Sequence, residues 1–138
     1  MMEFSQAIRV YYEDTDTGGV VYHSKYLNYC ERARTEALRS LGFEQDVLID
    51  EEDTIFAVRS IEVDYLKPAR FNDEIIVKTR VETLKKASIT FSQTILLKSD
   101  AQVLCRLSAR VACLTASGLR PRAIPQAIVN QMEALSAG

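Results

Sequence analysis

The chain has 138 residues, of which 47% are hydrophobic and 26% are charged, and its formal net charge is −2. This composition is typical of a globular protein with one core, so we expect a single domain over residues 1–138. The charge balance argues against nucleic-acid binding, no apolar run reaches the length of a membrane span, and the N-terminus lacks a secretion signal, so we expect a cytoplasmic location.

The first predicted element is a β-strand over residues 8–14, and it runs into an unusual segment. Residues 11–23 read YYEDTDTGGVVYH, in which Asp14 and Asp16 precede two adjacent glycines, Gly18 and Gly19, and the only histidine, His23. This order suggests a tight change of direction between the end of a strand and the start of a helix. The carboxylates suggest a metal loop, a phosphatase nucleophile or a carboxylate aimed at a helix N-terminus.

The first two of these interpretations fail on residue type. A calcium loop needs an oxygen ligand at position five and a glutamate at position twelve, where this chain has Gly18 and Lys25. A phosphatase of the haloacid dehalogenase type needs threonine or valine at the position of Gly18 and a larger parallel domain. A zinc site lacks ligands, because there is one histidine and no clustered cysteine. We therefore predict no metal.

A turn or capping aspartate is the simplest interpretation of Asp16, with the two glycines as a flexible turn and His23 as a helix-start residue. The grouping of these residues also suits acyl transfer. Glycines let a substrate carbonyl approach backbone N–H groups, and a helix N-terminus supplies unpaired donors with partial positive charge. A nearby carboxylate can attack the carbonyl or activate water while those donors hold the oxyanion.

The next segment predicts a helix over residues 24–41, with Ser24 as N-cap and Gly42 as the C-terminal stop. A polar flank is expected at Arg32, Arg34, Glu36 and Arg39, and residues 44–53 are expected to form an acidic loop. The apolar positions of the helix recur at helical spacing: Tyr26, Leu27, Cys30, Ala33, Ala37, Leu38 and Leu41.

Four runs with period two then predict antiparallel strands within residues 54–115, because no helix separates them. The last three runs are separated by short polar breaks, LKKAS and KSDAQ, which suit hairpins. Cys105 and Cys113 share a strand face with apolar residues, so we expect buried, reduced thiols. The tail PQAIVNQMEAL predicts a short helix with an apolar stripe of Ile128, Val129, Met132 and Leu135. The fold class is therefore α+β, with one long helix covering a sheet whose exposed edges favour dimerisation.

The segment YYEDTDTGGVVYHSKYLNYCERARTEALRSLG resembles the signature of the hot-dog-fold acyl-CoA thioesterases. It is most similar to the 4-hydroxybenzoyl-CoA thioesterase superfamily, in particular the bacterial acyl-CoA thioesterases associated with the Tol-Pal system. The resemblance is strong over residues 8–42 and extends more weakly through VDYLKPARFND and LKKASITFSQ. It implies a long antiparallel sheet wrapped around helix 24–41, and active sites at the interface of a homodimer or of a tetramer of dimers.

The resemblance also implies the site residues. Asp16 matches the catalytic aspartate, as nucleophile or general base, and the backbone N–H of His23 matches the oxyanion donor, with its imidazole as an additional orienting group. Gly19 and Tyr22 would shape the thioester pocket, whereas Asp14 would be structural. Thr17 departs from the family pattern, where alanine or proline is frequent.

Lys85, Lys86 and Ser88 match a hairpin that contacts the CoA nucleotide in relatives, and they equally suit a solvated hairpin. The implied partners are an acyl-CoA substrate, further copies of this chain, and proteins of fatty-acid and phospholipid synthesis or of the Tol-Pal system. No nucleic acid, membrane span or cofactor is implied, because CoA belongs to the substrate. Two alternatives stay open: an acyl-thioester hydratase or dehydratase, and a non-catalytic acyl-CoA-binding or envelope-complex accessory protein.

Overall fold

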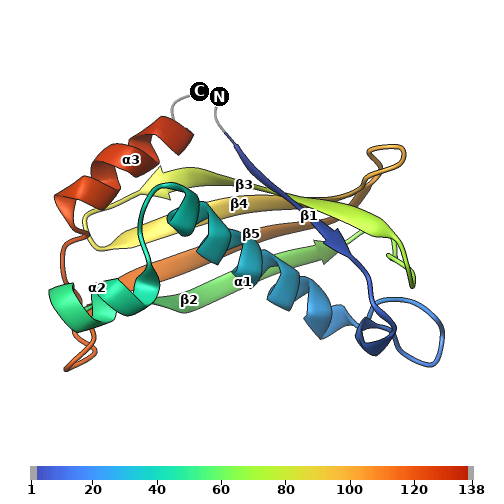
Figure 1. The fold of residues 1–138 in the computed structure, drawn as a ribbon, viewed down its shortest axis with the longest axis horizontal. Helices are drawn as coiled ribbons and strands as arrows, with labels where there is room; N and C mark the ends of the chain where they lie inside the picture. The colour runs from blue at the N-terminus through green and yellow to red at the C-terminus, as the bar shows by residue number, and fades with distance from the viewer. Residues whose placement is uncertain (1–2, 137–138) are drawn as a thin grey trace.

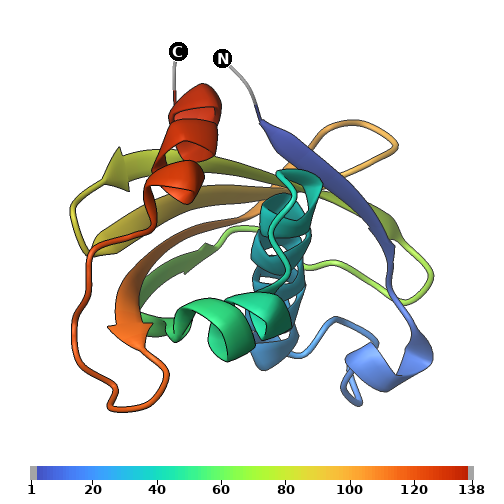
Figure 2. The same ribbon diagram turned by 60° about the vertical axis from the view of Figure 1, so that its left-hand side comes forward.

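The computed structural model describes residues 3–136, in which a curved sheet wraps around one long helix (Figures 1 and 2). The predicted order of a strand, a long helix, four strands and a short helix is confirmed, with one added helix after the long one. The elements are β1 (Phe4–Arg9), a 3-10 turn η1 (Tyr12–Asp14), α1 (His23–Ser40), α2 (Gln45–Glu52), β2 (Thr54–Tyr65), β3 (Glu74–Leu84), β4 (Ser88–Leu97), β5 (Val103–Thr115) and α3 (Gln126–Ser136).

The sheet has the strand order β1-β3-β4-β5-β2, and every strand pair is antiparallel, as predicted. Alternate residues of β3 and β4 are buried, which places their apolar face against the helix. Helix α1 lies along the concave side of the sheet (Figure 2). Ala33 and Ala37 are fully buried there, and their small side chains allow the helix to approach the strands closely. The two edges of the sheet are β1 and β2.

The predicted strand over residues 8–14 is wrong in position. Strand β1 starts at Phe4 and ends at Arg9, and residues 12–14 form η1 instead. The backbone turns because Asp14 accepts the Tyr11 N–H on its carboxylate oxygen Oδ2 at 3.0 Å, while its own N–H donates to the Tyr11 carbonyl. An aspartate that bonds to nearby backbone in this way competes with strand pairing. Asp14 is therefore structural, as expected.

The predicted acidic loop over residues 44–53 is also wrong, because most of it forms α2. Only Leu48 of this helix is buried, so the segment lacks the apolar stripe that would have identified it. The helix ends at Asp53, whose φ of 49° is left-handed. The Asp53 carboxylate accepts the Ser117 N–H at 2.7 Å and the Ser117 hydroxyl at 2.8 Å, which fastens the end of α2 to the segment after β5.

Both ends of the long helix are anchored in separate apolar clusters. One cluster surrounds Tyr26, Tyr29 and Cys30, and the other joins Leu38 to α3 through Ile128 and Met132. Gly42 stops the helix as predicted, since its φ of 96° suits glycine. In α3, Ile128 and Met132 are buried as predicted, and the side chain of Leu135 lies outside the described residues.

Candidate active site

The loop that follows η1 holds Asp16 on a tight turn. The Asp16 N–H donates to the Val20 carbonyl at 2.9 Å, and the Gly19 N–H donates to the Asp16 carbonyl at 3.0 Å. Gly19 has a φ of 77°, a conformation that glycine adopts without strain. Thr15 and Val21 pair as an antiparallel bridge and close the base of this loop. The result is an exposed carboxylate on the loop that leads into α1.

One oxygen of Asp16 has a structural task. Its Oδ1 accepts the Gly18 N–H at 2.8 Å, so the simple interpretation of Asp16 as a turn residue holds for that atom. The hydrogen bonds found among the described residues leave Oδ2 without a protein donor. The side chain is exposed rather than turned into the core. Asp16 therefore has one oxygen that fixes the loop and a second that is open to a substrate or water.

Helix α1 begins at His23, so the predicted N-cap, Ser24, lies inside the helix and Tyr22 takes the capping position without a side-chain cap. The reason lies in the preceding residues. The Val21 N–H donates to the Ala69 carbonyl at 2.8 Å and the Tyr22 N–H donates to the Asp14 carbonyl at 2.9 Å, which holds both residues extended. The His23 N–H is then the first of the helix and has no intrahelical acceptor. It carries part of the positive end of the helix dipole.

A cavity of about 270 Å³ adjoins this helix start. The Tyr65 hydroxyl donates to the His23 carbonyl at 3.2 Å, and the Tyr26 hydroxyl accepts the Ala69 N–H at 3.0 Å. Burial raises the pKa of both tyrosines, so their hydroxyls stay protonated near neutral pH. Backbone donors and an apolar wall thus meet at the N-terminus of α1. The cavity is lined by Val21, His23, Tyr26, Tyr65, Leu66, Lys67 and Pro68.

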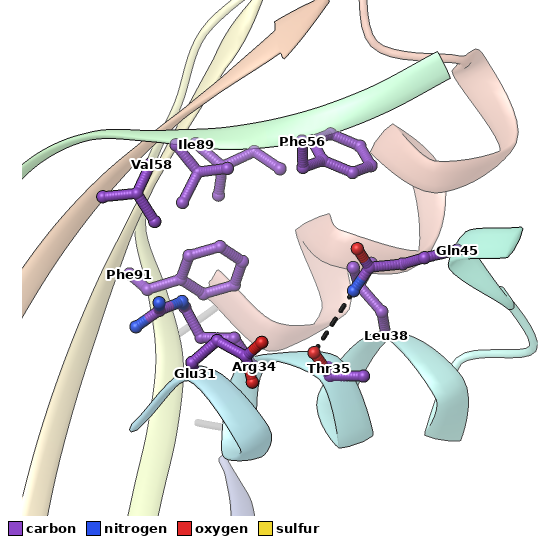
Figure 3. Close-up of a pocket in the computed structure, with 10 residues that line it drawn as sticks. Glu31, Arg34, Thr35, Leu38, Gln45, Phe56, Val58, Ile89 and Phe91 are labelled. Carbon is purple, nitrogen blue, oxygen red and sulfur yellow. Dashed lines mark hydrogen bonds between the residues drawn. The ribbon is translucent and has the colours of Figure 1, made fainter. Parts of the chain in front are cut away.

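A second pocket, of about 210 Å³, lies farther along α1 (Figure 3). Side chains of β2 and β4 form one side of it, and side chains of α1 form the other. At one end the Gln45 Nε2 donates to the Thr35 hydroxyl at 3.3 Å, which links the start of α2 to α1. The lining residues are Glu31, Arg34, Thr35, Leu38, Gln45, Phe56, Val58, Ile89, Phe91 and Val111.

Arg34 was predicted on the polar flank of the helix, and that prediction is wrong. It is only 7% exposed, and its Nη1 donates to the Gln93 Oε1 at 2.8 Å. Gln93 is buried as well, and its Nε2 donates to the Cys30 carbonyl and the Thr79 hydroxyl, each at 2.9 Å. The sequence held a signal for both residues. Arg34 lies four positions from Cys30 and from Leu38, on the apolar stripe of α1, and Gln93 falls on the buried face of β4.

Asp16, Gly19 and Tyr22 lie on the loop that leads into α1 at His23, but of these four residues only His23 lines the cavity. The predicted CoA-binding hairpin lies elsewhere. Lys85 and Lys86 are exposed in the turn between β3 and β4, and the half-buried Ser88 begins β4, at the opposite end of the sheet (Figure 1). Strand β3 separates the two ends, because Glu74 at its start pairs with Arg9 beside the site loop. Its 11 residues span roughly 35 Å at about 3.3 Å per residue.

The remaining reactive groups do not point to other chemistry. All three cysteines are buried and unpaired, and burial raises the pKa of Cys30 to about 12 and that of Cys105 to about 11, which keeps these thiols protonated. Within residues 3–136 there is no group of histidine, cysteine and acidic side chains arranged to hold a metal. Over the same range, no helix is both long and apolar enough to cross a membrane.

Comparisons with known proteins show the family of this chain. The family model of the Thioesterase superfamily matches residues 18–104. Acyl-CoA thioesterase YbgC of Haemophilus influenzae is 42% identical over 125 residues, covering 91% of this chain and 90% of the relative. Acyl-CoA thioester hydrolase YbgC of Escherichia coli O6:H1 is 39% identical over 130 residues, covering 94% and 96%. The crystal structure of a probable thioesterase from Bartonella henselae has 33% identity and a TM-score of 0.84, covering 90% of this chain and all of that one. This chain therefore belongs to the thioesterase superfamily and has its hot-dog fold.

Proposed function

We propose that this protein hydrolyses an acyl-CoA thioester to a free acid and CoA, with Asp16 as the reacting carboxylate and the His23 N–H as the oxyanion donor. The observation that carries the proposal is the presence of three features on or beside the loop that leads into α1. These are an exposed carboxylate fixed on a tight turn, an unpaired helix N–H and an apolar cavity lined by Tyr26 and Tyr65. Together they supply a nucleophile or base, a site for the oxyanion and a wall that excludes water.

The reaction follows from this arrangement. The thioester carbonyl oxygen accepts the His23 N–H, and the helix dipole stabilises the negative charge that develops there. In one route the Asp16 carboxylate attacks the carbonyl carbon, the C–S bond breaks, CoA leaves as its thiolate, and water hydrolyses the resulting anhydride. In the other route Asp16 removes a proton from a water molecule, which attacks the same carbon directly. Gly19 and Tyr22 shape the entrance, and neither route requires a cofactor.

We further propose that the complete site needs a second copy of the chain. Strand β2 is an edge strand, and Val58, Tyr65 and Leu66 on or beside it are apolar and about half exposed. A two-fold axis at the middle of β2 would pair this edge with the same edge of a second copy. The two β2 strands would run antiparallel, so the start of one would lie beside the end of the other. The hairpin of Lys85 and Lys86 of one copy would then lie at the His23 end of the other, where the lysines meet the CoA phosphates.

The finer aspects of the biological setting belong to the same proposal. Acyl-CoA as substrate suits a cytoplasmic enzyme, and a link to fatty-acid and phospholipid synthesis or to the Tol-Pal system stays a prediction from the family resemblance. One domain over residues 1–138 is favoured because α1 takes part in both apolar clusters. An arrangement of two dimers as a tetramer is compatible with a dimer formed through β2.

The test measures thiol release and double-bond hydration side by side. Wild-type protein is incubated with saturated aliphatic, aromatic and α,β-unsaturated acyl-CoAs, and both free CoA and hydrated acyl-CoA are quantified. We expect release of CoA from at least one saturated acyl-CoA at a rate far above the spontaneous rate. Hydration of the enoyl-CoA without thiol release would replace hydrolysis by the hydratase alternative. Tight binding of acyl-CoA without either product would indicate the non-catalytic alternative.

A further inference from the structure

We propose that the pocket of Figure 3 receives the acyl group and that Arg34 selects acyl groups whose far end carries a carboxylate. The inference rests on the proposed thioesterase function and adds the substrate class. It starts from an imbalance of charge: Arg34, a residue that is only 7% exposed, lines a pocket whose other walls are mostly apolar. Burial lowers the pKa of this group, yet an arginine keeps its proton at neutral pH.

Burial lowers the pKa of Arg34 and the charge of Glu31 raises it less, but within residues 3–136 no carboxylate forms an ion pair with it. Among the described residues, the hydrogen bond from its Nη1 goes to the neutral amide oxygen of Gln93, and no carboxylate lies within ion-pair distance. Gln93 is held in place by its bonds to the Cys30 carbonyl and the Thr79 hydroxyl, so its oxygen is fixed toward Arg34. For the other N–H donors of the guanidinium, no acceptor is found in the part of the chain that the structure describes. A buried charge in this condition is costly unless a bound group pairs with it.

The walls of the pocket define the rest of the ligand. Leu38, Phe56, Ile89, Phe91 and Val111 contribute apolar surface, which suits methylene groups. A ligand that satisfies both the walls and the guanidinium has an aliphatic body and an anionic end. The other charged residue of the lining, Glu31, is exposed and makes no ion pair with Arg34 within the described part of the chain. The volume of about 210 Å³ suits a short acyl group.

The position of the pocket is compatible with the reacting bond. His23 and Arg34 lie on one flank of α1, about 16 Å apart at 1.5 Å per residue, which is too far for a short acyl group within one copy. In the two-fold dimer proposed above, the two copies of this flank run in opposite directions. This arrangement brings the Phe56 and Arg34 end of one copy beside the His23 end of the other. A short dicarboxylic acyl group would then have its carbonyl at His23 and its carboxylate at Arg34 of the second copy.

The experiment compares adipyl-CoA with hexanoyl-CoA, which have equal chain lengths and differ in a terminal carboxylate. For the wild-type protein we expect kcat/KM to be about tenfold or more higher for adipyl-CoA, because a hydrogen-bonded charge pair is worth at least one order of magnitude in binding. Equal rates, or a preference for hexanoyl-CoA, would overturn the inference without any variant. The proposed function would survive that result, since thiol release would still occur, and it fails only if no acyl-CoA of the wider panel releases CoA.

Variants then assign the preference to one side chain. Arg34→Met removes the charge and should bring the ratio of the two kcat/KM values to about one or below, whereas Arg34→Lys should keep part of it. Arg39→Met is the matched control, because Arg39 lies on the same helix but is exposed and pairs with Glu36 and Glu44. It should leave the ratio unchanged. A soluble, folded Arg34→Met protein that retains the wild-type ratio contradicts the role given to Arg34.

Discussion

Tyr26 and Tyr29 are two buried tyrosines on the same face of α1, and their hydroxyl groups are in different situations. The Tyr26 hydroxyl accepts the buried Ala69 N–H at 3.0 Å, beside the candidate site. Among the described residues, neither the Tyr29 hydroxyl nor the Oε1 of Gln6 makes a hydrogen bond of good geometry, although burial and the nearby Asp14 carboxylate raise the pKa of Tyr29. Both of these orphaned atoms belong to residues that line a polar cavity of about 420 Å³ between β1 and α1. The two tyrosines therefore offer a matched pair for measuring what a hydroxyl contributes here.

We expect Tyr26→Phe to lower the free energy of unfolding by about 1–3 kcal/mol, because the Ala69 N–H is left buried without an acceptor. Tyr29→Phe should lower it by less than about 1 kcal/mol or raise it, because only a poorly aligned contact with the Asp14 carboxylate is lost and that carboxylate already accepts the Tyr11 N–H. Urea denaturation of the two variants checks this difference. An equal loss in both variants would mean that the contact of the Tyr29 hydroxyl with Asp14 is a full hydrogen bond.

At the same scale, the positions of some residues could be predicted from the sequence and those of others could not. The motif predicted that Asp16 and His23 lie close to a helix start, because local spacing fixes such an arrangement. Arg34 was misplaced, since an arginine on an apolar stripe conflicts with the expectation that charge is exposed. Its burial depends on Gln93, which is 59 residues away. A long-range hydrogen bond of this kind has no local signature.

At the scale of elements, the strongly periodic segments were predictable and the weakly patterned ones were not. Helix α1 and strands β2 to β5 follow clear apolar periods, so their type and order came from the sequence. Helix α2 was missed because burial of Leu48 alone leaves no stripe to detect. The end of β1 was displaced because Asp14 bends the chain through a side-chain bond. These errors lie where a few specific contacts outweigh the pattern.

Strand β2 is the element on which the proposed dimer depends. Ser60 is exposed and lies near the middle of this edge strand, next to an irregularity in its pairing with β5. In a two-fold dimer formed through β2, residue 60 faces its own copy, so Ser60→Asp places two like charges opposite each other. We expect this variant to be monomeric in sedimentation velocity and to lose most of its thiol release. Ser60→Asn, the neutral control, should behave as wild type. A Ser60→Asp protein that is dimeric and fully active would exclude β2 as the interface.

At the scale of the whole molecule, the sheet holds the candidate chemistry at one end and the basic hairpin at the other. The loop of Asp16 and the start of α1 occupy the first end, whereas Lys85 and Lys86 lie next to α3 at the second (Figure 1). The sequence could not reveal this separation, because it depends on the length and direction of β3. Because of this separation, we propose that the site is completed in a dimer. Two copies related by a two-fold axis would place the basic hairpin of one copy beside the candidate chemistry of the other.

The most direct test of the account is the rate of CoA release by Asp16→Asn. Asparagine keeps a side-chain oxygen that can accept the Gly18 N–H, so the turn is preserved while the carboxylate charge is lost. We predict that the variant folds and binds acyl-CoA but releases CoA at least about 10²–10³-fold more slowly than wild type. Near-normal turnover by this variant would show that Asp16 serves only the turn, and the assignment of the active site would be wrong.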